Sequence, residues 1–193
     1  DGKIALAGQR TPLTGEEAWK RVRKERGDYQ AILIGSQTAL IDNPILGTTD
    51  EDNFPPYRVV LDRKGEVLAH KEFALFQADS SPVLIFTERD DEIHLPEHVE
   101  VIRNQVLSLS FVVTELTKRN IQSLYVEGGA AIHDAFLASG YWDELVTYLA
   151  PKIIGGNGTA SFTGTRLVEQ VTALSDISIE QLGSDVRIAG RRV

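Results

Sequence analysis

The segment LYVEGGAAIHDAFLASG, from Leu124 to Gly140, places an acid and two glycines between an apolar run and a helix-like stretch. Gly128 and Gly129 lack side chains, so a ligand can approach the backbone, and the helix N-terminus that follows offers free N–H groups to a phosphate. Glu127 ends the apolar run, where a carboxylate must be paired, solvated in a cleft or used in chemistry. We call the junction between a strand and the helix that follows it a joint. The residues of this joint predict an anion-binding site, and the alternative is a simple turn in which Glu127 only caps the helix.

Other candidate residues follow other apolar runs, because ligands of open α/β sheets bind beyond the carboxyl ends of the strands. His133 lies in the first turns of the helix after Gly129, where it could touch the same ligand. The turn Asp62-Arg63-Lys64-Gly65 is either structural or a basic pair that meets an anion. A second glycine pair, Gly155-Gly156, follows LAPKII, but neither pair matches a GxGxxG fingerprint or a P-loop.

Composition excludes several classes of chemistry. The chain has 193 residues with no cysteine, which excludes disulfides, Cys-ligated zinc, iron–sulfur clusters and thiol nucleophiles. Its four histidines show no metal-ligand spacing and no GxSxG elbow is present, so we predict neither a protein-held metal nor a serine hydrolase of that type. The formal net charge of −8 argues against nucleic acid binding. Since no apolar run approaches the roughly 20 residues of a membrane span, we expect a cytoplasmic protein with a small-molecule substrate and no membrane partner.

Apolar runs that alternate with amphipathic segments predict an α/β domain with a largely parallel core. A T-x-x-E capping box at Thr14 is expected to open the first helix, and Gly27 to end it. The proline-rich segment 43–57 is predicted to be a surface loop. The last two strands, around a Gly183-Ser184-Asp185 turn, should form an antiparallel pair at the sheet edge. Expected strands cover residues 4–7, 31–35, 58–62, 82–86, 99–102, 123–126, 144–151, 173–183 and 185–193, and expected helices cover 16–26, 36–42, 110–120 and 128–140.

The chain carries, in this order, DGKIA, LTGEEA, AILIGSQTALIDNP, RVVLD, LYVEGGAAIHDAF and DELVTYLAPKIIGG. This order resembles the reductase domain of the bifunctional riboflavin-biosynthesis deaminase/reductase, over nearly the whole chain. The resemblance implies a dihydrofolate-reductase-like three-layer fold with a mixed, mostly parallel central sheet and an antiparallel C-terminal pair. Residues 1–193 are then expected to be a single reductase domain that starts within its first strand.

The resemblance implies NADPH-dependent reduction of 5-amino-6-(5-phosphoribosylamino)uracil to 5-amino-6-(5-phosphoribitylamino)uracil, with hydride delivered to C1 of the ring-opened sugar. It also implies a homodimer, for which the C-terminal strands could supply the contact. Two alternatives stay open. One is an NADPH reductase of the same fold that acts on another pterin-like or carbonyl substrate, and the other is a non-catalytic nucleotide-binding module.

The positions that match the family's motifs indicate which residues of this chain form the site. The resemblance implies a pyrophosphate-binding run from Gly129 to Ala135 and substrate contacts by Glu127, Arg26 and Leu46. Glu127 is also the candidate catalytic group, because it could take part in proton transfer. We add Arg63 for the 2′-phosphate of NADPH and Thr87 as a further cofactor contact, since both follow strand ends. The predicted cofactor-binding residues are Thr38, Asp42, Arg63, Thr87, Gly128, Gly129, Ala130, Ala131, Ile132 and His133.

Departures from the family pattern concern the substrate phosphate. Arg10-Thr11-Pro12 stands where the family usually has S-x-W, and Leu46-Gly47-Thr48-Thr49 stands where it has Leu-Thr-x-Arg. The second departure removes an arginine expected to grip the sugar phosphate. We therefore predict that Arg10 is a substrate-binding residue that replaces this charge. A lysine that precedes S-L-D-G-K in the family would lie ahead of Asp1.

Overall fold

The computed structural model describes residues 1–48, 56–77 and 81–193. None of the helices in these ranges is long and apolar enough to cross a membrane. The strands are β1 (Lys3–Leu6), β2 (Ala31–Gly35), β3 (Tyr57–Leu61), β4 (Val83–Thr87), β5 (Val99–Arg103), β6 (Leu124–Gly128), β7 (Glu144–Leu149), β8 (Gly158–Ala160), β9 (Leu174–Leu182) and β10 (Asp185–Arg192). The α-helices are α1 (Glu16–Arg26), α2 (Ser36–Asp42), α3 (Ala74–Gln77), α4 (Leu109–Lys118) and α5 (Ala130–Ser139), and short 3₁₀ turns lie at Val67–Ala69 and Val168–Gln170.

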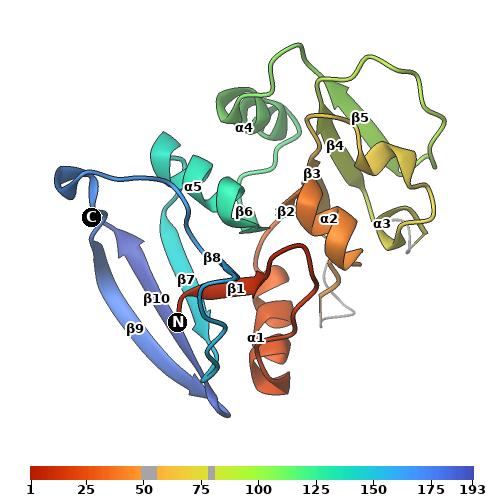
Figure 1. Cartoon of the computed structure of the whole chain (residues 1–193). Coiled ribbons are helices and arrows are strands. Elements are labelled where there is room, and N and C mark those ends of the chain that lie inside the picture. Colours follow the sequence, from red (N-terminus) through yellow and green to blue (C-terminus); the bar gives the residue numbers. More distant parts are fainter. Residues whose placement is uncertain (49–55, 78–80) are drawn as a thin grey trace.

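Five parallel strands form the larger sheet, in the order β5-β4-β3-β2-β6 (Figure 1). The apolar runs of β2 and β4 are buried at every position, as expected of parallel strands that need cover on both faces. The predicted α/β class and parallel core are confirmed.

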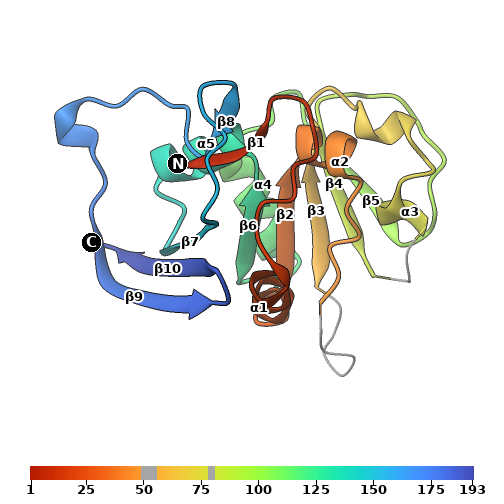
Figure 2. The same cartoon turned by 60° about the horizontal axis from the view of Figure 1, so that its bottom comes forward.

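Helices cover both faces of this sheet (Figure 2). On one face, Ile34 and Val60 of the sheet pack with residues of α2 and α3. On the other face, Leu33 and Phe86 pack with residues of α4 and α5. The alternate side chains of one strand therefore enter two separate cores, which gives the three layers expected from the sequence.

A second, antiparallel sheet has the order β7-β10-β9. The predicted C-terminal hairpin is confirmed, since β9 and β10 pair around Gly183. Strand β7, which follows α5, does not join the parallel sheet: it pairs antiparallel with β10, with Leu149 opposite Val186. The crossover rule holds only for strands of one sheet, and nothing in the pattern of β7 tells which sheet it joins.

The start of the chain forms a separate ribbon. The apolar residues predicted at 4–7 lie in β1, which pairs antiparallel with β8, so that Leu6 lies opposite Gly158. This ribbon runs across the top of the molecule in Figure 2, near the start of α5. The first and last thirds of the chain are thereby joined beside the carboxyl ends of the parallel strands.

The capping box predicted at Thr14 is wrong. Helix α1 begins at Glu16, Gly15 is its N-cap, and within the described chain no side chain caps it by a hydrogen bond. The Gly15 N–H instead donates to Asp185 Oδ2 of β10 at 2.6 Å. A tertiary contact thus supplies the acceptor that the local pattern was expected to provide.

Helix ends agree better with the sequence. Helix α1 ends before Gly27, as predicted. Helix α2 ends at the Asp42-Asn43-Pro44 turn, with Asn43 in the left-handed region at φ 43°, which asparagine tolerates better than most residues. The second turn is important for the site, because the chain then passes to Leu46 and back across the end of α1.

Candidate active site

The joints predicted to carry chemistry lie side by side at the carboxyl edge of the parallel sheet. Their order is that of the strands: the ends of β6, β2, β3 and β4. Neighbouring strands are about 4.8 Å apart, so the row from β6 to β4 is about 14 Å long. An extended ligand that lies along this edge can therefore touch every joint, which a compact ligand at one joint cannot do.

The joint between β6 and α5 requires both glycines. A Cβ on Gly128 would lie 2.7 Å from the Ile132 side chain, too close for any other residue. Gly129 has φ +85°, a conformation that L side chains rarely adopt, and a Cβ there would lie 3.4 Å from Thr38 Oγ1. The side chain of Ile132 fills the space under the turn, and it packs in the core. The backbone, and not side chains, thus forms the surface of this joint.

The first turn of α5 presents donors beyond the helix. The N–H groups of Ile132 and His133 donate to the Gly129 carbonyl, at 3.0 and 3.1 Å. Helix geometry leaves the N–H groups of Ala130 and Ala131 without an acceptor inside the helix. Among the predicted pyrophosphate residues, these two backbone groups are the best placed to meet an anion.

Thr38 lies against the same joint from α2. Its hydroxyl donates to the Gly128 carbonyl at 3.4 Å. The structure therefore brings together Thr38, Gly128 and Gly129, which the sequence separates by 90 residues.

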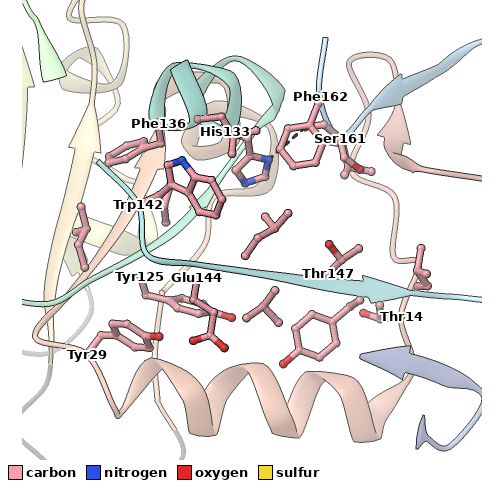
Figure 3. A pocket seen from close by; sticks show the side chains of 18 of the residues that line it. Thr14, Tyr29, Tyr125, His133, Phe136, Trp142, Glu144, Thr147, Ser161 and Phe162 are labelled. Carbon is pink, nitrogen blue, oxygen red and sulfur yellow. Dashed lines mark hydrogen bonds between the residues drawn. The ribbon is translucent and has the colours of Figure 1, made fainter. Parts of the chain in front are cut away.

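His133 turns away from this cluster. Its Nδ1 lies 3.3 Å from the Ser161 carbonyl, and its ring lies 5.7 Å from that of Phe162 (Figure 3). Burial lowers the pKa of His133, although the Ser161 carbonyl and the charge of Asp134 oppose the shift. The imidazole ring of His133 packs against residues 161–162. If His133 contacts the cofactor as predicted, its backbone is better placed to do so than its ring.

Glu127 forms a bidentate ion pair with Arg26 from the end of α1. The distances are 2.5 Å from Nε to Oε1 and 2.7 Å from Nη2 to Oε2. The side chains are only 18% and 7% exposed, respectively. The fork geometry fixes the positions of both carboxylate oxygens. Glu127 is therefore arranged as a fixed hydrogen-bond acceptor, which suits holding a ligand better than carrying a proton.

Arg26 also orders the loop after α2. Its Nη1 donates to the Gly47 carbonyl at 2.9 Å. The preceding Leu46 is buried in the core and has φ 57°, so its backbone, held beside Arg26, is the part that faces the site. Three predicted substrate residues, Arg26, Leu46 and Glu127, are thus brought together. Thr49, the position of the lost arginine, lies outside the described residues.

Arg10 is exposed, and its positive charge acts on the carboxylate of Asp42. Burial raises the pKa of Asp42, and the positive charge of Arg10 partly offsets the shift. These two predicted residues, one assigned to the substrate and one to the cofactor, therefore share one corner of the site at the end of α2.

Hydrogen bonds connect the segments at the ends of β3 and β4. The Thr87 hydroxyl donates to the Arg63 carbonyl at 3.4 Å and accepts from the Arg89 N–H at 3.2 Å. Thr87 is fully buried, so it shapes the turn from below. The Arg63 side chain is 68% exposed and lies 3.5 Å from Glu88, which leaves its guanidinium accessible to an anion. Of these two predicted cofactor residues, Arg63 has the accessible charge.

Sequence reasoning named Asp62 only as part of a turn and did not single out Asp134, although both acids build the edge. Asp62 accepts hydrogen bonds from the N–H groups of Glu66, Val67 and Leu68, and so holds the turn that presents Arg63. Asp134 binds Arg166 Nη2 at 2.7 Å. The Asp62 contacts are local and an Asx-type motif could have predicted them, whereas the partner of Asp134 is 32 residues away.

Comparisons with known proteins agree with this architecture. The family model described as RibD C-terminal domain matches residues 1–188. The riboflavin biosynthesis protein RibD of Bacillus amyloliquefaciens is 32% identical over 201 residues, which cover 97% of this chain and 53% of that protein. The chain thus spans about half the length of the RibD proteins that it matches.

Two further relatives have informative names. A crystal structure of a diaminohydroxyphosphoribosylaminopyrimidine deaminase/5-amino-6-(5-phosphoribosylamino)uracil reductase from Thermotoga maritima has a TM-score of 0.87 and 31% identity, and the match covers 100% of this chain and 54% of that one. The 2,5-diamino-6-ribosylamino-4(3H)-pyrimidinone 5′-phosphate reductase of Methanothermobacter thermautotrophicus is 28% identical, over 96% of this chain and 90% of that protein.

Proposed function

We propose, because the chain belongs to the RibD C-terminal domain family, that it reduces 5-amino-6-(5-phosphoribosylamino)uracil to 5-amino-6-(5-phosphoribitylamino)uracil with NADPH. The observation that carries the proposal is the row of joints at the carboxyl edge. It combines the side-chain-free cradle at Gly128 and Gly129 with an ion-paired carboxylate, Glu127, at the same strand end.

The residues present fit a dinucleotide phosphate. No side chain covers the turn at Gly128 and Gly129, because a Cβ at Gly128 would clash with Ile132 and Gly129 has φ +85°. The N–H groups of Ala130 and Ala131 point beyond the helix, where the helix dipole also favours an anion. When bound, the nicotinamide supplies a hydride to C1 of the sugar, opened to an imine, while the imine nitrogen gains a proton. The residues of the chain would hold, orient and shield the reactants.

Selectivity for NADPH over NADH would come from the end of β3. Arg63 and Lys64 form an exposed basic pair there, and Arg63 is 68% exposed. The pair lies two strands from the glycine joint, about 10 Å along the edge, so a dinucleotide whose pyrophosphate sits on α5 can extend toward it. An additional phosphate would meet these charges.

The substrate would lie on the other side of the glycine joint. Glu127 offers carboxylate oxygens to the N–H groups of a pyrimidine, and the bidentate pair with Arg26 holds those oxygens in place. Arg10 would meet the sugar phosphate. An Arg10→Ala variant should show a raised KM for substrate with an unchanged KM for NADPH, and an unchanged substrate KM would remove Arg10 from the site.

The decisive assay measures NADPH oxidation with the phosphoribosylamino-uracil and, in parallel, with its 2,5-diamino-pyrimidinone counterpart. The Methanothermobacter relative, matched over 90% of its length, is named for the second compound, so that compound is the competing substrate. We expect the higher kcat/KM with the uracil. The reverse ratio would reassign the substrate, and no NADPH oxidation with either compound would contradict the proposal.

Cofactor binding can be tested separately with a matched pair of glycine variants. Gly129→Ala forces a side chain into the left-handed region at the candidate pyrophosphate site, whereas Gly140→Ala does so at φ +75° at the other end of α5. We expect at least tenfold weaker NADPH binding in the first variant and no change in the second. Equal affinities would place the cofactor elsewhere.

We also propose that the protein is a cytoplasmic homodimer. Strand β9 supports the dimer, because Ile177 and Ile179 are 51% and 71% exposed on the outer strand of the antiparallel sheet. An Ile179→Glu variant should sediment as a monomer, while Ile153→Glu, at another exposed isoleucine, should not change the oligomeric state. A monomeric parent protein would contradict the proposal.

A further inference from the structure

An acid lies beside the basic residue that is proposed to select the coenzyme. Strands β3 and β4 are neighbours in the parallel sheet (Figure 2), with Arg63 just beyond the end of β3 and Glu88 directly after β4. The Nε of Arg63 lies 3.5 Å from Oε1 of Glu88. Their backbones are also joined, because the Glu88 N–H donates to the Arg63 carbonyl at 3.1 Å. A negative charge therefore lies where the 2′-phosphate of NADPH is proposed to bind.

A second contact fixes the Glu88 carboxylate independently of Arg63. Its Oε1 accepts a hydrogen bond from the Leu107 N–H, between β5 and α4, at 2.7 Å. This length is ordinary for a hydrogen bond to a charged acceptor, whereas the 3.5 Å to Arg63 is long for one. The carboxylate of Glu88 therefore keeps its place when the Arg63 side chain turns toward another anion.

The other oxygen of Glu88 is available to a ligand. Among the residues that the structure describes, Oε2 has no hydrogen-bond partner, and the side chain is 30% exposed. An ionised carboxylate only accepts hydrogen bonds. A hydroxyl group of a ligand is therefore stabilised at this place, and a ligand anion is repelled by the same charge.

The neighbouring ion pair is closed by comparison. The stem of Arg89 lies on the turn after β3, since a Cβ on Gly65 would lie 2.7 Å from Cγ of Arg89. The guanidinium of Arg89 binds Asp91, with 2.9 Å between Nε and Oδ2. Arg89 thus already has a close anionic partner, so of these two pairs the one between Arg63 and Glu88 is the one that a ligand can open.

We infer that Glu88 sets the coenzyme preference of this protein and admits NADH as a second hydride donor. NADH and NADPH differ only at the 2′ position of the adenosine ribose. A carboxylate suits the 2′-hydroxyl of NADH and an arginine suits the 2′-phosphate of NADPH, and this site has both. With NADH, Glu88 accepts from the hydroxyl; with NADPH, Arg63 pairs with the phosphate while Glu88 opposes it. The inference rests on the proposed function and adds a coenzyme to it.

The test measures the affinities of NADPH and NADH by the fluorescence of the reduced nicotinamide, in the parent protein and in Glu88→Gln. Glutamine keeps the size of the side chain and an oxygen that can accept from the Leu107 N–H, but it removes the charge. We expect NADPH to bind more tightly and NADH more weakly, so that the ratio of the two affinities shifts at least about tenfold. A purely structural role of Glu88 would change both affinities equally, and an unchanged ratio would overturn the inference.

Glu66→Gln is the matched control. Glu66 is exposed and lies in the same turn as Arg63, where its backbone N–H donates to Asp62. The substitution removes the same charge from the same edge without touching the pair of Arg63 and Glu88. Because exposed charges are screened by salt, we expect the ratio to stay within about twofold of the parent value at physiological ionic strength. A shift as large as that of Glu88→Gln would attribute the preference to overall charge and not to this contact.

A double variant separates direct contact from an effect through Arg63. In the Arg63→Ala background, Glu88→Gln should still weaken NADH binding, because the bond to the 2′-hydroxyl does not need the arginine. Unchanged NADH binding there would contradict the inference, as would a parent protein that binds NADPH alone, which would leave the proposed function intact. A parent protein that binds neither coenzyme would contradict the proposed function itself.

Discussion

The two sheets of this protein are stabilised in different ways. In the parallel sheet, β2 and β4 are buried at every position and each face has its own apolar core. In the antiparallel sheet, β9 is largely exposed, and Ile179 reaches 71%. The parallel half therefore contains its own core, whereas the antiparallel half depends on how it is attached.

A polar cluster around Glu25 of α1 connects the antiparallel sheet to the rest of the molecule. The Glu25 carboxylate accepts from Arg187 Nε of β10 at 2.7 Å, and from the hydroxyls of Tyr148 of β7 at 2.6 Å and Tyr125 of β6 at 3.1 Å. Burial opposes its ionisation, but the hydrogen bonds from Tyr148, Arg21 and Tyr125 and the charge of Arg187 hold the pKa of Glu25 below its ordinary value. One carboxylate thus connects a helix with strands of both sheets.

The largest expected effect tests the apolar half of the comparison. Ile85→Ala removes a fully buried side chain of β4 and should lower the free energy of unfolding by about 4 kcal/mol, because it leaves a cavity in a packed core. The same substitution at Ile179, measured below the protein concentration at which the proposed dimer forms, should change it by less than about 0.5 kcal/mol. Urea unfolding measures both. Similar losses would show that the antiparallel sheet has a buried core of its own.

The next effect tests the polar attachment. Glu25→Ala leaves the guanidinium of Arg187, whose side chain is only 11% exposed, without its main partner, and should cost about 3 kcal/mol. The matched control Glu16→Ala breaks the exposed pair with Lys20 on the same helix and should leave the unfolding midpoint unchanged. Hydrogen exchange should show loss of protection in β7 and β10 before β3 and β4. Uniform loss would contradict a separate attachment.

A smaller effect tests whether the cofactor binds to the parallel sheet alone. Arg63→Ala should raise the KM for NADPH about tenfold, equivalent to about 1.4 kcal/mol, with no change in the KM for NADH or in stability. Lys118→Ala, which removes another exposed cation, is the control and should change neither KM. Equal increases for both coenzymes would mean that Arg63 does not meet the 2′-phosphate.

The smallest effect concerns the segment 161–166, which Asp134 holds against α5. Burial would raise the pKa of Asp134, but the hydrogen bonds from Arg166, Thr163 and Gly164 outweigh it and lower the pKa to about 2. The carboxylate is therefore bound more strongly in the folded state, and its contribution, complete above pH about 4, is lost as the pH falls toward 2.

Amide resonances of Thr163 and Gly164 should shift over that pH window, because both N–H groups donate to Asp134. The amide of Gln170, which donates to the Leu167 carbonyl, should not shift with them, and in Asp134→Asn the transition should be absent. A midpoint near pH 4 would mean that the carboxylate is not held by these bonds.

Local patterns predicted the parallel half well. Continuous apolar runs located β2, β3 and β4, and the glycines located the joint before α5, since both features depend on neighbouring residues. The cluster around Glu25 had no such signal, because Arg187 is 162 residues away. The capping box at Thr14 failed for the same reason, as an acid 170 residues from Gly15 supplied the acceptor.

The candidate site was predictable by position and less so by role. Glu127 was singled out from the residues, and Arg26 and Thr38 from the family resemblance. Neither predicted that Arg26 pairs with Glu127, because that contact depends on where α1 ends relative to β6. The sequence also located Thr87 without showing that its hydroxyl lies beneath the turn. Side-chain direction at a strand end is set by packing across strands, and one sequence contains no record of it.

The contact between Glu25 and Arg187 also has a consequence for biosynthesis. A ribosome that adds 5 to 20 residues per second needs roughly 10 to 30 s to make the 162 residues between them. During that interval α1 and the parallel strands can assemble, while the surface of α1 that later contacts β10 is exposed to solvent. Because that surface carries the Glu25 carboxylate, the nascent chain does not expose a wholly apolar surface that would favour aggregation or chaperone binding.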